Sequence, residues 1–124
     1  MNKVELTPNT HKGKLIIFEG TDGAGKTTLI NLTYRYLKDK YPNKEVILLK
    51  QPTEEARNSR LFQTMMFDEN HENINYRAVQ LLTLSDRIQH NHEVIIPALK
   101  EGKIIICDRY IYTSIANMKA RNYR

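Results

Sequence analysis

The sequence has little of what extracellular and membrane proteins depend on. Cys107 is its one cysteine, so no disulfide can form within the chain, which suits a reducing compartment. No apolar run approaches the ~20 residues that cross a bilayer. The first residues also lack the apolar segment of a secretory signal. We therefore expect a cytoplasmic protein that does not associate with a membrane.

The sequence also lacks a concentrated block of basic residues, although its formal net charge is +5. Lys and Arg are spread along the 124 residues, whereas nucleic-acid-binding surfaces combine a basic stripe with interleaved aromatics. Phosphorylated small molecules account for the surplus at least as well. No internal repeat, low-complexity tract or second domain boundary is visible. These features predict one domain that does not bind nucleic acid.

The most informative motif that is present lies at residues 20–27, which read GTDGAGKT. They fit G-x-x-x-x-G-K-[ST], in which glycines let the backbone curl around phosphates. An apolar run at 15–18 precedes the motif and a helical pattern at 27–41 follows it, which is the strand–loop–helix context that such a loop requires. The motif predicts that Lys26 reaches the β- and γ-phosphates and that the Thr27 hydroxyl holds Mg²⁺.

The remaining pattern predicts a doubly wound α/β fold. Continuous apolar runs at 46–49 and 104–107 are typical of parallel strands that are covered on both faces. We expect three parallel strands and an order β-α-β-α-α-β-α, with residues 1–13 as a loose leader. The helices of this order are expected at 27–41, 75–91, 94–99 and 111–118, and residues 60–67 are expected to form a short additional helix. A break or a new start is expected near Pro97, and an end at Gly102.

Polar residues follow each predicted strand, and ligands of such sheets bind beyond the carboxyl ends of the strands. Gln51 follows the second strand, and Asp108 with Arg109 follows the third. Asp108 either holds Mg²⁺ through water, orients an attacking oxygen, or caps the next helix. Arg109 either binds a phosphate through paired hydrogen bonds or forms a surface salt bridge. The presence of the glycine loop favours the functional alternatives.

Other charged residues carry weaker signals. Asp22 either holds a sugar hydroxyl or caps the loop. Arg87 follows Asp86 on a predicted helix, where a solvated ion pair is the plain interpretation. Arg57 and Arg60 follow the second strand and could reach a phosphate. The histidines are not spaced for a metal site.

Together these motifs resemble the thymidylate kinase family of P-loop nucleoside monophosphate kinases. The resemblance runs from about Lys14 to the C-terminus. The segments that carry it are 18–28 (FEGTDGAGKTT), 50–53 (KQPT), 85–87 (SDR), 96–99 (IPAL) with Gly102, and 107–110 (CDRY). The glycine loop and the Asp-Arg-Tyr element are specific, and the other segments are supportive.

The resemblance implies an enzyme that transfers the γ-phosphate of ATP to a deoxynucleoside monophosphate, usually dTMP, with Mg²⁺. Catalysis would then fall to Lys26, Asp108 and Arg109, and Thr27 with Asp108 would hold the metal. The ATP phosphates would be bound by Gly20, Thr21, Asp22, Gly23, Ala24, Gly25, Lys26, Thr27 and Thr28. The acceptor nucleotide would be bound by Asp22, Gln51, Arg60, Arg87 and Arg109.

The sequence departs from the family in several places. Thr83 stands where members that bind thymine place an aromatic residue one turn before Arg87, so the base stays open. Lys50 and Gln51 replace the family's Arg-Glu before proline. Gly23 stands where some members have arginine, and members with glycine there take a catalytic arginine from their lid.

Family members are longer and their sheets have five strands, so we expect residues 14–124 to be the N-terminal portion of the kinase domain, without lid and last two strands. The expected partners are ATP and the acceptor, with a homodimer or a complementing C-terminal half. The alternative is a non-catalytic nucleotide-binding or interaction module that needs a partner half. A small GTPase is disfavoured, because the guanine-binding Asn-Lys-x-Asp is absent.

Overall fold

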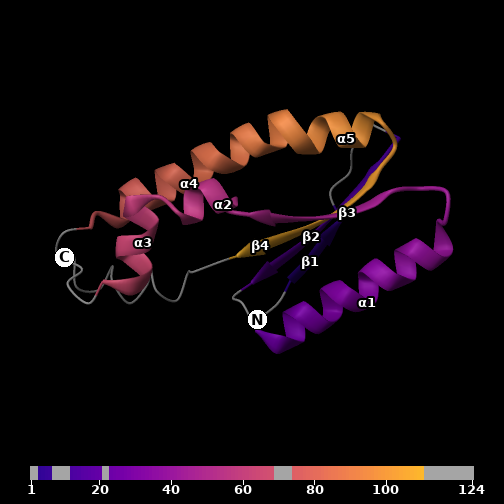
Figure 1. Cartoon of the computed structure of the whole chain (residues 1–124), viewed down its shortest axis with the longest axis horizontal. Coiled ribbons are helices and arrows are strands. Elements are labelled where there is room, and N and C mark those ends of the chain that lie inside the picture. Colours follow the sequence, from indigo (N-terminus) through magenta and orange to yellow (C-terminus); the bar gives the residue numbers. More distant parts are fainter. Residues whose placement is uncertain (1–2, 7–11, 21–22, 69–73, 111–124) are drawn as a thin grey trace.

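A computed structural model describes residues 3–6, 12–20, 23–68 and 74–110. The strands β1 (Lys3–Leu6), β2 (Lys14–Gly20), β3 (Val46–Gln51) and β4 (Ile104–Tyr110) form one sheet in the order β1-β2-β4-β3. β4 lies between β2 and β3 and is parallel to both (Figure 1). The predicted α/β fold with three parallel strands is therefore confirmed.

Strand β1 lies within the segment predicted as a loose leader, and that prediction is wrong for these residues. β1 pairs antiparallel with β2, from Lys3 opposite Glu19 to Leu6 opposite Ile16. Pairing satisfies backbone N–H and C=O groups that an edge strand would otherwise present to solvent. β1 thus adds a fourth strand that no apolar run in the sequence predicts.

The two faces of the sheet pack against different helices, which explains the continuous apolar runs. Helix α1 (Ala24–Lys40) covers one face, where Ile30 and Leu37 pack with Phe18, Ile104 and Ile106. On the other face, two short helical segments contribute Ile95, Ala98 and Leu99, which pack with Ile105. These segments are the π-helical turn η2 (Asn91–Ile95) and α5 (Ile96–Lys100). Neighbouring residues of β4 therefore point into different apolar layers.

A smaller layer of helices stands near the carboxyl ends of the parallel strands. It comprises α2 (Glu54–Arg57), α3 (Arg60–Phe67) and α4 (Tyr76–His90), and its core contains Phe62, Met65, Ile74 and Val79 (Figure 1). The predicted helices at 60–67 and 75–91 are confirmed, whereas α2 is not among the predicted elements. The helix predicted at 111–118 lies outside the described residues.

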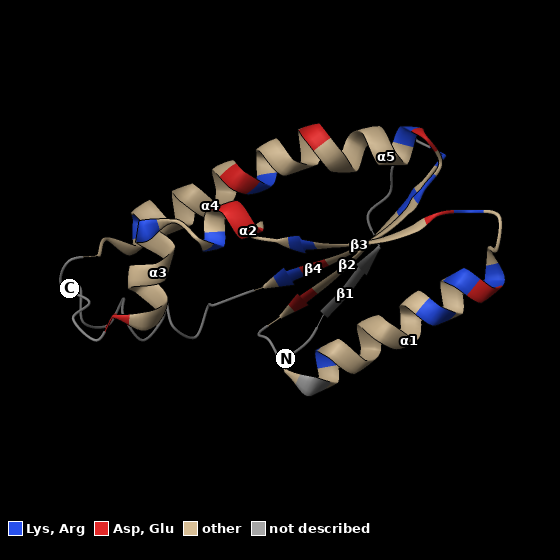
Figure 2. Ribbon diagram, viewed as in Figure 1, with Lys and Arg blue, Asp and Glu red and all other residues tan. Residues whose placement is uncertain are grey.

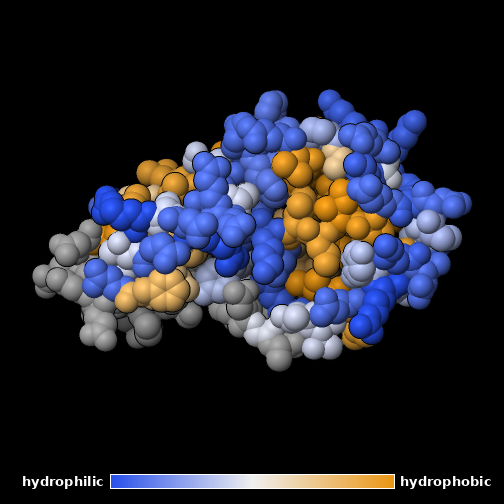
Figure 3. Space-filling model, viewed as in Figure 1, coloured by the Kyte–Doolittle hydropathy of each residue, from blue (hydrophilic) through white to orange (hydrophobic). Residues whose placement is uncertain are grey.

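The sheet surface between the helix layers stays partly apolar. Figure 3 shows an apolar area between α1 and α5, and Leu48 of the edge strand β3 is 45% exposed. Within the part of the chain that the structure describes, no helix is both long and apolar enough to cross a membrane.

Candidate nucleotide site

Among the residues that the structure describes, no side chain caps the N-terminus of α1. Its N-cap is Gly23, which makes no side-chain hydrogen bond, and the first turn of α1 contains no acidic residue. In contrast, the side chains of Thr53, Ser59 and Asn75 cap α2, α3 and α4. An uncapped helix N-terminus presents backbone N–H groups and the positive end of the helix dipole to an anion. Thr21 and Asp22, which belong to the same loop, lie outside the described residues.

Lys26 joins the glycine loop to the end of β4. Its side chain is almost fully buried, and its Nζ lies 2.6 Å from Oδ1 of Asp108. The same ammonium group donates to the carbonyl oxygens of Gly20, at 3.0 Å, and Arg109, at 3.2 Å. The loop and the Asp-Arg element therefore meet in space, although 83 positions separate Lys26 from Arg109.

The oxygen donors near the loop fit Mg²⁺. Thr27 and Thr28 are exposed in the first turn of α1, and the Asp108 side chain is 23% exposed. No group of three or more His, Cys, Asp or Glu side chains is arranged to hold a metal among the described residues. Mg²⁺ needs no such cage, because phosphates and water commonly complete one or two protein oxygens. Its binding by Thr27 and Asp108 stays a prediction.

Arg109 lies in a partly buried ion pair. Its Nη1 is 2.6 Å from Oε1 of Glu19, and its Nε donates to Oε1 of Gln51 at 3.3 Å. Glu19 and Arg109 are paired across β2 and β4, and Figure 2 shows an acidic segment beside basic ones at these strand ends. Glu19 is not among the site residues predicted from the sequence. One signal in the sequence could have revealed it. Glu19 directly precedes the glycine loop at the end of one predicted strand, and Arg109 directly follows Asp108 at the end of a parallel one, so the two side chains could be expected to lie side by side.

Gln51 connects this ion pair to α4. Its side chain is almost fully buried, and its Nε2 lies 3.0 Å from Nδ1 of His90 and donates to Oδ1 of Asn91 at 2.9 Å. The following Pro52 is joined by a cis peptide bond. Burial lowers the pKa of His90 from the ordinary 6.5, while the carboxylates of Asp86 and Glu93 oppose this shift. Gln51 is among the site residues predicted from the sequence, whereas His90 is not.

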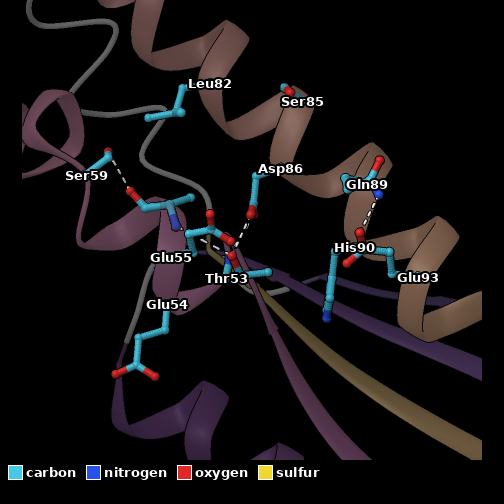
Figure 4. A pocket seen from close by; sticks show the side chains of 11 residues that line it. Thr53, Glu54, Glu55, Ser59, Leu82, Ser85, Asp86, Gln89, His90 and Glu93 are labelled. Atoms are coloured by element: carbon cyan, nitrogen blue, oxygen red, sulfur yellow. Dashed lines mark hydrogen bonds between the residues drawn. The ribbon is translucent and has the colours of Figure 1, made fainter.

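Asp86 forms no solvated pair with Arg87 but anchors the loop that follows β3. It accepts hydrogen bonds from the Thr53 backbone N–H, at 2.8 Å, and from the Thr53 hydroxyl (Figure 4). Arg87 is half-buried, and its charge acts on Cys107 of β4 together with those of Arg109 and Lys26. These cations lower the pKa of Cys107, yet burial dominates and raises it to about 11. Arg87 therefore lies within electrostatic reach of the β4 end.

Of the two arginines near α2, the structure ties one to the site. Nε of Arg57 donates to the carbonyl oxygen of Pro52 at 2.9 Å, and its guanidinium lies 5.7 Å from the centre of the Tyr110 ring. Arg60 is exposed at the first position of α3. Within the described residues, no hydrogen bond or ion pair links the Arg60 side chain to Gln51 or Arg109. The guanidinium of Arg57 therefore lies closer to the contacts at the end of β4 than that of Arg60 does.

Comparisons with known proteins agree on the family. The thymidylate kinase family model matches residues 18–122. A probable thymidylate kinase of Pyrococcus horikoshii is 41% identical over 113 residues, which cover 89% of this chain and 54% of that protein. The thymidylate kinase of Neorickettsia sennetsu is 39% identical over 102 residues, which cover 82% and 48%.

A solved structure gives the same result. A crystal structure of thymidylate kinase from Ehrlichia chaffeensis matches with a TM-score of 0.58 and 32% identity, covering 84% of this chain and 57% of that one. The chain spans about half the length of the curated relatives it matches. Because the family model matches most of its residues, this chain belongs to the thymidylate kinase family.

Proposed function

We propose that this chain carries the phosphate-binding half of a thymidylate kinase, which transfers the γ-phosphate of ATP to a deoxynucleoside monophosphate, with dTMP the first candidate. The observation that carries the proposal is the meeting of Lys26 with Asp108 and with the Arg109 backbone. There the lysine of the glycine loop lies beside a carboxylate and against the main chain of the following arginine, at one strand edge, as a phosphate site of such a sheet would need. Relatives named thymidylate kinase support the same activity.

On the donor side, the uncapped end of α1 and the Lys26 ammonium would bind the ATP phosphates. Lys26 would exchange some of its present carbonyl and carboxylate contacts for phosphate oxygens. Thr27 and Asp108 would hold Mg²⁺, which neutralises phosphate charge when bound. The protein's own contribution would be alignment and charge stabilisation, because phosphoryl transfer needs little covalent chemistry from side chains.

On the acceptor side, Arg109 would bind the monophosphate through its guanidinium, which Glu19 and Gln51 hold in place. Arg87 and Arg57 would supply further positive charge at the same strand ends. The roles of Asp22 and Arg60 stay predictions from the sequence. The Thr83 hydroxyl donates to the carbonyl oxygen of Gln80, at 3.1 Å, on its own helix.

Isothermal titration calorimetry tests nucleotide binding. We expect heat with ATP·Mg²⁺ and with dTMP. Magnesium-free ATP should release less heat than ATP·Mg²⁺, and the other nucleoside monophosphates should release less heat than dTMP. Circular dichroism on the same sample establishes that the chain is folded. A folded chain that releases no heat with either nucleotide would contradict the proposal.

Turnover is tested separately, because the chain spans about half the length of its relatives. We propose that transfer needs the remaining length, and that assembly with it, or as a homodimer, completes the site. A coupled kinase assay on this chain, alone and mixed with the C-terminal half of a relative, measures that need. Binding without transfer in both samples would favour the non-catalytic module, and sedimentation would report the homodimer.

A further inference from the structure

The buried amide of Gln51 is fixed from three directions. Its Oε1 accepts from Nε of Arg109 at 3.3 Å. Its Nε2 carries two hydrogens and faces two acceptors, Nδ1 of His90 at 3.0 Å and Oδ1 of Asn91 at 2.9 Å. Only one orientation of the amide satisfies all three contacts. The acceptor arginine on β4 is therefore connected through one side chain to the end of α4.

This orientation requires a neutral His90. Because an amide nitrogen can only donate, Nδ1 of His90 must accept, and its proton must reside on Nε2. Protonation would turn Nδ1 into a second donor that faces the Gln51 nitrogen. The amide would then have to rotate, and its nitrogen would meet the donating Nε of Arg109. Arg109 would lose its Gln51 contact and keep only its ion pair with Glu19.

The charged groups around His90 decide whether its imidazole stays neutral. In Figure 4 the His90 side chain extends from α4 toward the strands. The titratable and charged groups that line the same hollows are Lys50, Glu54, Glu55, Arg57, Asp86 and Glu93. The Asp86 carboxylate accepts a hydrogen bond from the Thr53 N–H, and the Glu93 carboxylate accepts one from the Gln89 amide. Both carboxylates favour the imidazolium, but burial outweighs them and keeps His90 neutral near pH 7.

We propose that Gln51 is a positioning residue for Arg109, and that neutral His90, with Asn91, holds its amide in the orientation that Arg109 needs. The proposal rests on the proposed function, in which Arg109 binds the acceptor phosphate. The proposal gives a role to Gln51, which stands where the family usually has a glutamate. A carboxylate could accept from Arg109 but could not donate to His90 or Asn91. The amide therefore matches the neutral histidine, and a glutamate would match the imidazolium.

Histidine NMR tests the amide orientation without any nucleotide. In the full chain we expect the ring of His90 to carry its proton on Nε2 and to titrate below the ordinary 6.5. His90→Gln and His92→Gln assign the signals, because His92 is exposed two residues away and serves as the matched reference. Gln51→Glu should raise the pKa of His90 above its value in the wild type. An unchanged His90 titration in folded Gln51→Glu, or a proton on Nδ1 in the wild type, would overturn the proposal.

Acceptor affinity across pH tests the consequence for Arg109. The phosphate of dTMP itself titrates near pH ~6, so the wild type is compared with His90→Gln, whose amide oxygen accepts at every pH. As the pH falls through the His90 pKa, the wild type should lose about three- to tenfold more dTMP affinity than His90→Gln. His92→Gln should follow the wild type. Equal profiles for wild type and His90→Gln would overturn the proposal.

The two experiments separate this inference from the proposed function. If dTMP releases no heat at any pH, the assignment of Arg109 to an acceptor phosphate fails, while the NMR titration still decides whether His90 fixes the Gln51 amide. If Gln51→Glu does not fold, His90→Gln carries the test, because it leaves Gln51, Arg109 and Glu19 in place. Gln51→Ala then gives an independent measure, with an expected three- to tenfold loss (~1 kcal/mol) in dTMP affinity.

Discussion

The two sides of the candidate site differ in how their polar groups are satisfied. On the glycine-loop side, none of the described side chains caps α1, and Thr27 and Thr28 are exposed. At the ends of β3 and β4, Gln51 and Arg109 each have protein partners within hydrogen-bond distance. The first side therefore has a helix end without a described side-chain acceptor, whereas the polar groups of the second side already have protein partners. Pre-organised groups bind with a smaller ordering cost, so we expect the acceptor side to change little when it is occupied.

Lys26 belongs to both sides, and its removal should have the largest effect. Lys26→Ala should lower phosphoryl transfer by the completed enzyme about a hundredfold or more, since a charged donor to the phosphates is lost. It should also destabilise the chain by about 1–3 kcal/mol, because Asp108 loses its partner at 2.6 Å. Calorimetry with ATP·Mg²⁺, a coupled assay and urea unfolding measure these effects.

Two further variants separate the contributions of Lys26. Lys38→Ala changes an exposed lysine in the last turn of the same helix and should leave binding unchanged. The double variant Lys26→Ala with Asp108→Asn should recover stability but not ATP affinity, because it removes the unpaired carboxylate. If Lys26→Ala bound ATP·Mg²⁺ as the wild type does, the glycine loop would not be the donor site.

Arg109→Ala should show that the strand-end side serves the acceptor. We expect dTMP affinity to fall about ten- to a hundredfold, the range of a lost charge-assisted contact, with ATP affinity nearly unchanged. Calorimetry with each nucleotide in turn gives the ratio, and Arg35→Ala, an exposed arginine of α1, is the control. Equal losses for both nucleotides would show that the two sides are not separate.

The sequence was sufficient to predict the side of the site that depends on local pattern. The loop at 20–27 is contiguous, and the apolar runs before it and at 104–107 predict parallel strands. The helix expected at 60–67 has those bounds because Ser59 caps it and its apolar residues recur at helical spacing. Lys26 and Asp108 could be expected to meet, since both follow strands of one parallel sheet.

The strand-end side could not be predicted in the same way, because it depends on pairing across distance. Glu19 meets Arg109 through the β2–β4 register, which no local pattern encodes. Gln51 reaches His90 across 39 positions. The short helix α2 has too few residues to show a period, yet it decides that Arg57 rather than Arg60 lies against Tyr110. Strand β1 has four residues and was missed for the same reason.

Asp86→Ala should test how rigidly the strand-end side is held. The variant leaves the Thr53 N–H and hydroxyl without their acceptor, so we expect a loss of about 1–3 kcal/mol in the free energy of unfolding. Urea unfolding measures it, and Glu93→Gln, an exposed neighbour on the same hollow, should change stability by less than about 0.5 kcal/mol. A native-like Asp86→Ala would mean that the loop after β3 is held by other contacts.

Cys107 should have no effect on stability at neutral pH, the smallest effect of the series there, and should report on both sides together in the alkaline range. Its pKa is raised from 9.0 to about 11, chiefly by burial, so the thiol stays protonated in the folded chain when it ionises in the unfolded one. Stability should therefore be intact below pH ~9 and should fall, by at most about 3 kcal/mol, as the pH rises toward ~11. Urea unfolding of wild type and Cys107→Ala across this range isolates the thiol from other alkaline titrations. Because Arg109 and Lys26 both lower this pKa, removing either cation should extend the decline to higher pH. A wild type that follows Cys107→Ala at every pH would show that the thiol is not held protonated.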